Sequence, residues 1–377
     1  MANTLTNLTP DIYAALDTVS RELVGFIPSV TRDAQAARVA VGQSLRSPVA
    51  PAASSQNATV GMSLPTAAYQ TIGNKSITIT KSKEVPISWQ GEEIAAMNSG
   101  AGHANILRDQ FAQAMRTLSN EIESDIAAAA RVGASRAYGT SGTTPFASDL
   151  SASAQLRKIL DDNGAPLSER SLVIDTSAGA KLRTLGQLTK ANEAGTSMTL
   201  RDGELLNLQG FSVKESAQVV NVTAGTGASY LINESGGYAI GDTSLTLDTG
   251  SGTILAGDVI TIGAHKYVVK TALASNVVVI QDPGLRAAVA NNAAVTVNAD
   301  HTANAGFTRS AIVLATRLPN LPAQGDQAID RMVVTDPRSG ISFEIALYPG
   351  VRMVTYLVSA AWGVSVFKNE HVATLLG

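Results

Sequence analysis

A single apolar stripe runs without interruption through the sequence from Ala104 to Arg131. Its members are large apolar residues at spacings of three or four: Leu107, Phe111, Met115, Leu118, Ile122 and Ile126. This spacing predicts an amphipathic helix whose other faces carry the charged residues Arg108, Asp109, Arg116, Glu121, Glu123 and Asp125. At 1.5 Å per residue the segment would span roughly 42 Å, far beyond the average helix. We therefore predict a rod that acts as a structural backbone, with the stripe as core rather than as a cofactor site.

Two segments of different character precede this helix. A shorter stripe predicts an amphipathic helix that begins near Thr9 and ends at Pro28, with Ile12, Leu16, Val19, Leu23 and Phe26 on one face. Residues 47–68 are rich in Ala, Ser and Pro and show neither helical nor strand period. Such a segment is typical of a flexible linker, or of an arm that becomes ordered only against a neighbouring subunit. The sequence leaves both open.

A hairpin is predicted between the arm and the long helix. Ser76–Thr80 alternates cleanly, Val85–Trp89 follows it, and the polar Lys81–Glu84 would form the turn between them. Pro86 lacks a backbone N–H, so the second strand should lie at the edge of its sheet. Further along, between residues 164 and 220, short strands and helices alternate without strict βαβ order.

That mixed region contains three specific predictions. Ser171–Ile174 should be a buried strand, Ser177 should cap a helix that runs to Leu188, and a glycine turn with another strand should lie between Leu206 and Val213.

Short strands separated by Gly, Asp, Asn and Ser dominate from about residue 221 to residue 300. The candidates are Ser244–Leu247, Asp258–Ile262, Lys266–Val269, Asn276–Ile280 and Ala294–Val297. About 80 residues suffice for an independent β-domain, of barrel or sandwich type. Mixed character then resumes, with a buried segment at 310–316, strands at 342–348, 351–359 and 362–368, and a short helix or strand at 369–376. The β-segment is therefore predicted to be inserted into a discontinuous α/β domain.

Residues that could carry catalysis are scattered. The four histidines, His103, His265, His301 and His371, have no partner at metal-ligand spacing, so we expect surface or interface positions. The pairs Glu92-Glu93 and Asp161-Asp162 are adjacent in sequence, do not face one another, and are expected to be solvated. No cysteine is present, and no glycine-rich stretch has the pattern of a phosphate loop, dinucleotide site or nucleophile elbow. We predict no catalytic, cofactor-binding or metal residues, and no enzyme.

The order of these parts resembles the major capsid (coat) proteins of tailed bacteriophages, of the short-tailed-phage type with an inserted telokin-like domain. Three segments carry the resemblance: Ser76–Trp89 is similar to the family's strand pair before its spine helix, Leu208–Ser216 to its turn ahead of the insertion, and Gly306–Arg317 to the segment that re-enters the main domain. The resemblance covers nearly the whole chain. Its motifs are structural and moderately specific, so their order carries the comparison.

The resemblance implies an α+β fold, the tailed-phage capsid fold of Hong Kong ninety-seven type. It assigns an N-terminal arm and helix to 1–47, an extended loop to 48–74, a peripheral domain with the spine helix 104–131 to 75–144, an axial and peripheral α/β domain to 145–220, an inserted β-barrel domain to 221–303, and the axial return with C-terminal peripheral strands to 304–377.

The resemblance also implies assembly. Hexamers and pentamers of this chain would form an icosahedral shell in the bacterial host cytoplasm, with a scaffolding protein and a portal as partners. The procapsid would expand as DNA is packaged, and the virion would enclose double-stranded DNA without sequence-specific binding. A formal net charge of -3 fits such a shell, which has no need to grip its DNA.

Charged residues make up only 16% of the chain against roughly 25% in average proteins, which indicates surface hidden against other subunits, or a genome biased toward Ala and Gly. No membrane association is expected, because no apolar stretch approaches the length of a spanning helix. A surface-layer or adhesin-type structural or binding protein is the alternative. It predicts an export signal, which the N-terminal sequence lacks, and repeated β-domains, of which the sequence shows one.

Overall fold

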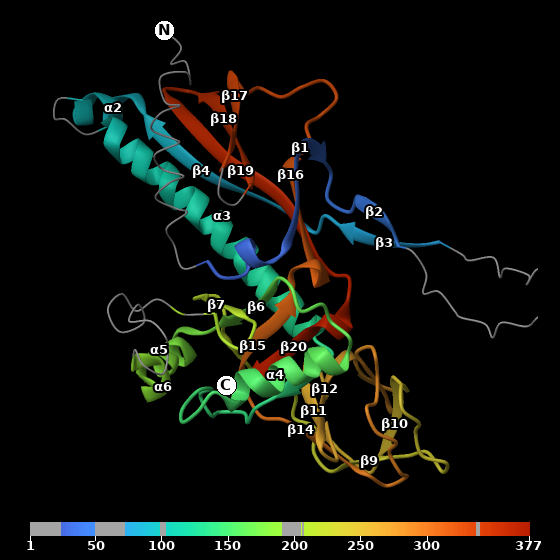
Figure 1. Ribbon diagram of the computed structural model, residues 1–377. Helices are drawn as coiled ribbons and strands as arrows, with labels where there is room; N and C mark the ends of the chain where they lie inside the picture. Colours follow the sequence, from blue (N-terminus) through green and yellow to red (C-terminus); the bar gives the residue numbers. More distant parts are fainter. Residues whose placement is uncertain (1–23, 50–71, 99–102, 191–204, 206, 337–339) are drawn as a thin grey trace, which may run out of the picture.

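The computed structural model describes residues 24–49, 72–98, 103–190, 205, 207–336 and 340–377. The helix predicted from Thr9 to Pro28 therefore lies almost wholly outside the described residues, as does most of the extended loop predicted at 48–74. Within the described ranges, strands outnumber helices and the architecture is mixed α+β (Figure 1).

The long helix is the axis of the molecule. It is α3 (His103–Gly133), which confirms the helix predicted at 104–131. All six residues of the predicted stripe are buried, none with more than 2% of its surface exposed. In Figure 1, α3 runs diagonally from α2 (Gly91–Asn98) toward the second sheet and the barrel. The stripe is covered by residues of the first sheet, the second sheet and the barrel, which form one apolar cluster with it.

The first sheet packs along much of α3, since Trp362 donates to Asp125 and Val366 lies against Gly133. Its strands run in the order β1 (Thr31–Val39), β16 (Ile312–Pro319), β19 (Met353–Val366), β18 (Ser342–Gly350) and β17 (Asp330–Thr335), with β4 (Lys81–Gln90) paired to β19. Phe111 of α3 meets the ring of Tyr356 edge-on at 5.4 Å between centroids, and Trp362 is fully buried. The two strands predicted at 351–359 and 362–368 are one continuous strand, β19.

The predicted hairpin of Ser76–Thr80 with Val85–Trp89 is wrong. The first segment lies in β3 (Gly73–Thr78), which pairs with β2 (Ser44–Val49), whereas the second lies in β4, which pairs with β19 from Lys81–Trp362 to Gln90–Met353. Lys81–Glu84, predicted as the turn, continue β4 because β19 satisfies their backbone groups. The edge position predicted for Pro86 is confirmed: among the described strands, β4 pairs with β19 alone.

The second sheet belongs to a 12-stranded set and lies beyond the middle of α3. Its body has the order β5 (Arg136–Tyr138), β20 (Val372–Leu376), β15 (His301–Thr308), β6 (Arg170–Ile174) and β7 (Ser212–Glu215), with β8 (Asn221–Val222) paired to the start of β15. The segment 369–376, predicted as helix or strand, contributes strand β20. The buried strand predicted at Ser171–Ile174 is confirmed as β6.

Three helices cover this sheet: α4 (Ser151–Asp162), α5 (Thr176–Thr184) and α6 (Gly186–Thr189). The predicted cap of α5 is wrong. Asp175, not Ser177, is the N-cap, since its carboxylate accepts the N–H groups of Ser177 and Ala178 at 3.0 and 3.3 Å. The helix ends at Thr184, and Leu188 belongs to the separate turn α6.

A closed barrel forms the end of the molecule farthest from the first sheet (Figure 1). Its strands are β9 (Tyr230–Ile232), β10 (Ser244–Asp248), β11 (Val259–Ile262), β12 (His265–Ala274), β13 (Val277–Ile280) and β14 (Ala294–Val297). The order β11-β14-β9-β10-β13-β12 returns to β11, so the ring has no open edge. Each of its pairings is antiparallel. All five predicted strands of this region are confirmed as β10–β14. The barrel has its own apolar core, which includes Ile232, Leu245, Ile260, Tyr267 and Ile280.

Candidate functional site

The described residues contain no group of three or more side chains that could hold a metal ion. No helix in the described ranges combines the length and apolarity needed to cross a membrane. Four surface features of the described residues are candidates for contact with other molecules: a projecting hairpin, the charged edge at its base, the tip of the first sheet, and the point where the N-terminal segment is fixed.

The hairpin β2–β3 projects from the body of the molecule (Figure 1). Its two strands pair in register from Ser44–Thr78 to Val49–Gly73. The side chains of Arg46, Lys75 and Ser76 are exposed. An isolated two-stranded hairpin is at best marginally stable in water. The buried apolar contacts of this one are at its base, where Leu45 and Ile77 lie.

The base of the hairpin is fixed to the first sheet. Val39, Ile77, Ile79, Ala315 and Ala361 form a small buried cluster there. The N–H of Ile79 donates to the carbonyl of Gln43 at 3.1 Å, and the N–H of Thr80 donates to the carbonyl of Trp362 at 3.1 Å. Gly363 of β19 lies so close to the backbone of Thr78 that a Cβ would overlap it.

A chain of charges ties together the strands beside this base. Glu344 accepts hydrogen bonds from Arg38 of β1 at 2.7 Å and from Arg331 of β17 at 2.5 Å. Arg331 also pairs with Asp326, whose carboxylate accepts the hydroxyl of Tyr348 at 2.6 Å. The hydrogen bond from Arg331 lowers the pKa of Asp326 well below its usual range. The network cross-links β1, β17 and β18, so the hairpin leaves from a rigid edge.

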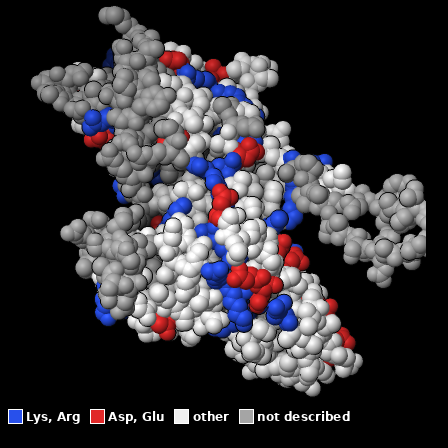
Figure 2. Space-filling model, viewed as in Figure 1, with Lys and Arg blue, Asp and Glu red and all other residues white. Residues whose placement is uncertain are grey.

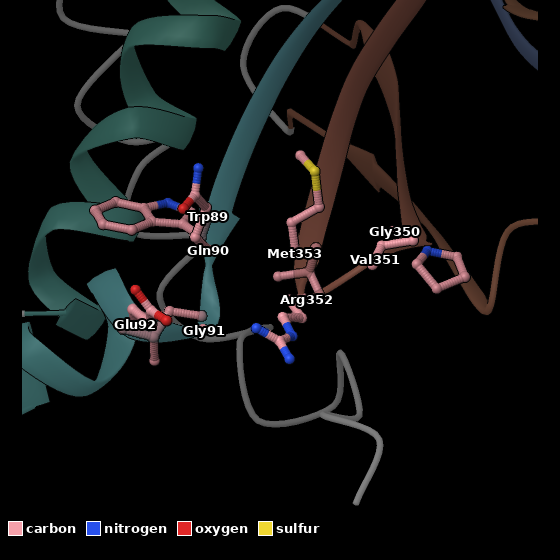
Figure 3. A pocket seen from close by; sticks show the side chains of 11 residues that line it. Trp89, Gln90, Gly91, Glu92, Gly350, Val351, Arg352 and Met353 are labelled. Carbon is pink, nitrogen blue, oxygen red and sulfur yellow. The ribbon is translucent and has the colours of Figure 1, made fainter.

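The tip of the first sheet holds an open pocket of about 830 Å³ between the end of β4 and the β18–β19 turn (Figure 3). Figure 3 shows Trp89, Glu92 and Met353 around it, with Arg352 between the two sides. Val351 at the turn is 92% exposed. Gly91 donates its N–H to the carbonyl of Arg352 at 3.0 Å, which joins the start of α2 to the turn. Glu92 and Glu93 are exposed at the start of α2, as predicted.

Glu123 was predicted to lie on a polar face of the long helix, and this is wrong. Its side chain is buried, and one carboxylate accepts three backbone N–H groups: those of Gly25 and Phe26 at 2.7 Å each and that of Ile27 at 2.9 Å. Burial raises the pKa of the Glu123 carboxyl, and the backbone donors oppose that rise. The carboxylate is buried because the chain at 25–27 covers this flank of α3 and needs an acceptor for its N–H groups.

The surface or interface positions expected of the histidines are wrong for two of them, which are buried within the subunit itself. His301, the first residue of β15, is 1% exposed, and its Nδ1 lies 2.9 Å from the carbonyl oxygen of Ala299. His371, just before β20, is 7% exposed. Burial lowers the pKa of both rings. Both lie at strand entrances of the second sheet, a position that no local pattern around an isolated histidine reveals. His265 is partly buried at the start of β12, and the side chain of His103 lies outside the described part of the structure.

The pair Asp161-Asp162 is exposed at the end of α4, as predicted, but both residues are also ion-paired. Asp161 lies 2.7 Å from Arg170, and Asp162 lies 3.4 Å from Arg136 and 3.7 Å from Arg286. These pairs join α4 to β6, β5 and the barrel. Sequence spacing could not find them, because each partner comes from a distant element.

No protein-family model and no curated protein matches the sequence. Solved structures do match. The capsid structure of the cyanophage P-SCSP1u aligns with a TM-score of 0.52 and 13% identity, over 94% of this chain and 88% of that one. The mature capsid of bacteriophage PhiM1 aligns with a TM-score of 0.46 and 11% identity, over 93% and 86%. A capsid of a native GTA particle aligns with a TM-score of 0.46 and 10% identity, over 94% and 90%.

The likeness to the cyanophage capsid extends over nearly the full length of both chains, so it includes both sheets, the long helix and the barrel region. At 13% identity it establishes the arrangement of the backbone and nothing about individual side chains. The chain therefore has the fold of a phage capsid protein.

Proposed function

We propose that this chain is the major capsid protein of a tailed bacteriophage and self-assembles into the icosahedral shell that encloses the phage's double-stranded DNA. The observation that carries the proposal is the near full-length likeness to the cyanophage P-SCSP1u capsid. The projecting hairpin supports it, because an isolated two-stranded ribbon is at best marginally stable in water and a neighbouring subunit would cover it. The role is structural rather than enzymatic.

The finer assignments are part of the same proposal. The fold is of Hong Kong ninety-seven type, α3 is its spine helix, and the barrel within 221–303 is a domain inserted into the α/β body. Residues 48–74, continuous with β2 and β3, form the extended loop that reaches a neighbouring subunit. The subunits form hexamers and pentamers in the host cytoplasm with the help of a scaffolding protein and a portal, and they end in the virion.

Electron microscopy tests the proposal directly. The full chain is expressed and viewed by negative stain, alone and after addition of a lysate from infected cells that supplies the assembly partners. Closed shells of uniform curvature are the expected result. Dispersed subunits under both conditions would contradict the proposal, and flat two-dimensional arrays would favour a surface-layer protein.

Trypsin tests the role of the hairpin. Residues 47–74 contain no Lys or Arg, so the exposed Arg46 and Lys75 are the cleavage sites that would release the loop. Free subunits should lose the fragment between these sites, whereas subunits in shells should keep it because a neighbour covers the hairpin. The double variant Arg46→Gln/Lys75→Gln is the matched control and should resist release in both states. Equal release of the fragment from wild-type subunits and shells would contradict the contact.

A further inference from the structure

A second pocket, of about 490 Å³, lies where three elements meet: β5, α4 and the start of β12 in the barrel. Figure 2 shows Lys, Arg, Asp and Glu side chains gathered where α4 meets the barrel. Two of the elements that line it, α4 and β12, lie at the other end of the molecule from α2 and the tip of the first sheet (Figure 1). The side chains that matter to its chemistry are Arg136, Lys158, Asp162, His265 and Lys266.

Arg136 carries a buried donor that no described residue of the protein satisfies. Its side chain is only 7% exposed, and its Nη2 donates at 3.3–3.4 Å to the carbonyl of Ile159 and the side chains of Asp162 and Asn163. Its Nε has no hydrogen-bond partner among the described residues and is itself closed to solvent. An unpaired buried N–H is costly, and the charge of the guanidinium adds to the positive potential of the pocket.

The two lysines of the pocket also lack anionic partners. Lys266 donates to the carbonyl of Gly139, and burial lowers the pKa of its ammonium group. Neither Lys266 nor Lys158 forms an ion pair with any carboxylate in the described ranges. An ammonium group that is partly removed from water and paired only with a carbonyl is poorly compensated.

The only carboxylate among the described lining residues is already shared. Asp162 lies 3.4 Å from Arg136 and 3.7 Å from Arg286, so it neutralises at most one of these arginines. His265 adds a ring nitrogen to the wall, and burial together with Arg136, Lys158 and Arg286 lowers its pKa. The wall therefore carries an excess of positive charge, because Arg136, Lys158 and Lys266 face the single carboxylate of Asp162.

We propose that this pocket binds a small tetrahedral oxyanion of the phosphate class. Lys158 and Lys266 supply the donors, since charge-assisted hydrogen bonds to oxyanions are the strong ones, and the charge of Arg136 adds to the attraction. The bound anion connects α4 and β5 of the body to β12 of the barrel. It therefore stabilises the orientation of the barrel, which the β5–β12 pairing of Ala137 with Lys266 already begins to fix.

Calorimetric titration of the full-length chain with inorganic phosphate, at constant ionic strength in chloride buffer, tests the site. Wild type should bind with a saturable heat. Lys266→Gln and Lys158→Gln should each weaken binding about tenfold, because each removes one charge-assisted hydrogen bond. Lys270→Gln is the matched control: it lies on the same strand, pairs with the exposed Asp282, and should leave binding unchanged.

The signal of His265 in NMR spectra provides a second readout. Phosphate should raise the pKa of this ring in wild type, and about tenfold more phosphate should be needed for the same change in Lys158→Gln, whose substitution at an exposed helix position keeps the fold. No saturable binding to wild type, or equal loss in Lys158→Gln and Lys270→Gln, would overturn the proposal. Nonspecific attraction would be shown by a response to phosphate that disappears when chloride is raised to the same ionic strength.

Discussion

Replacing Glu123 with alanine should destabilise the subunit more than any other single carboxylate removal on α3. The change leaves three buried N–H groups, those of Gly25, Phe26 and Ile27, without their acceptor. An unsatisfied buried donor costs about 1–3 kcal/mol, so three give at most about 9 kcal/mol. Loss of the buried charge and entry of water offset part of this, and we expect about 3–5 kcal/mol.

Urea unfolding followed by tryptophan fluorescence measures the effect. Trp89 and Trp362 both report on α3, because their Nε1 groups donate to its Gln110 and Asp125 at 2.9 and 2.7 Å. Glu121→Ala is the matched control on the same helix. Glu121 forms only an exposed pair with Lys83 at 3.4 Å, so its removal should cost less than about 1 kcal/mol.

The conservative variant refines the test. Glu123→Gln keeps one acceptor oxygen but turns an amide N–H toward a backbone N–H, so its loss should fall between those of wild type and Glu123→Ala. If the free energies of unfolding of Glu123→Ala and Glu121→Ala agree within about 0.5 kcal/mol, the carboxylate does not hold residues 25–27 and the reasoning fails.

Three further results are expected. Burial lowers the pKa of His301 and His371 in the folded protein. Their neutral rings therefore contribute to stability above the unfolded-state pKa of about 6.5, and this contribution is lost as the pH falls below that pKa. The melting temperatures at pH 7.5 and pH 5 should accordingly differ less in the double variant His301→Gln/His371→Gln than in wild type. Gly363→Ala should lower the melting temperature by several degrees, since its Cβ overlaps Thr78. Leu118→Ala should cost about 2–5 kcal/mol in urea unfolding, by opening a cavity in the stripe.

Regular periodicity was enough to predict the elements whose burial is decided within one segment. The stripe of α3 repeats at helical spacing, so any surface that covers it produces the same helix. The barrel strands β10–β14 alternate between turn residues, and this pattern predicts strands regardless of their order.

Strand partners were not visible in the sequence. Lys81–Glu84 is polar enough for a turn, but it becomes strand because β19 offers ten consecutive partners to β4. The alternation of β3 is satisfied by β2 just as it would have been by β4. Local patterns specify that a strand forms, whereas the identity of its neighbour depends on segments that are distant in the chain.

Site-level features depended on the same distant contacts. Glu123 is charged and flanks the stripe, so the sequence pattern predicts that its side chain is exposed to solvent. Only the approach of residues 25–27 makes it a buried hydrogen-bond acceptor. The excess of positive charge around Arg136 arises where α4, β5 and β12 meet, and none of these segments shows it alone. The sequence by itself determined the long helix and the strand-rich barrel, because periodicity and turn residues are local properties. The tertiary structure alone decided which strands pair, which charges are buried and where the hairpin projects, because these depend on what the fold brings to each surface.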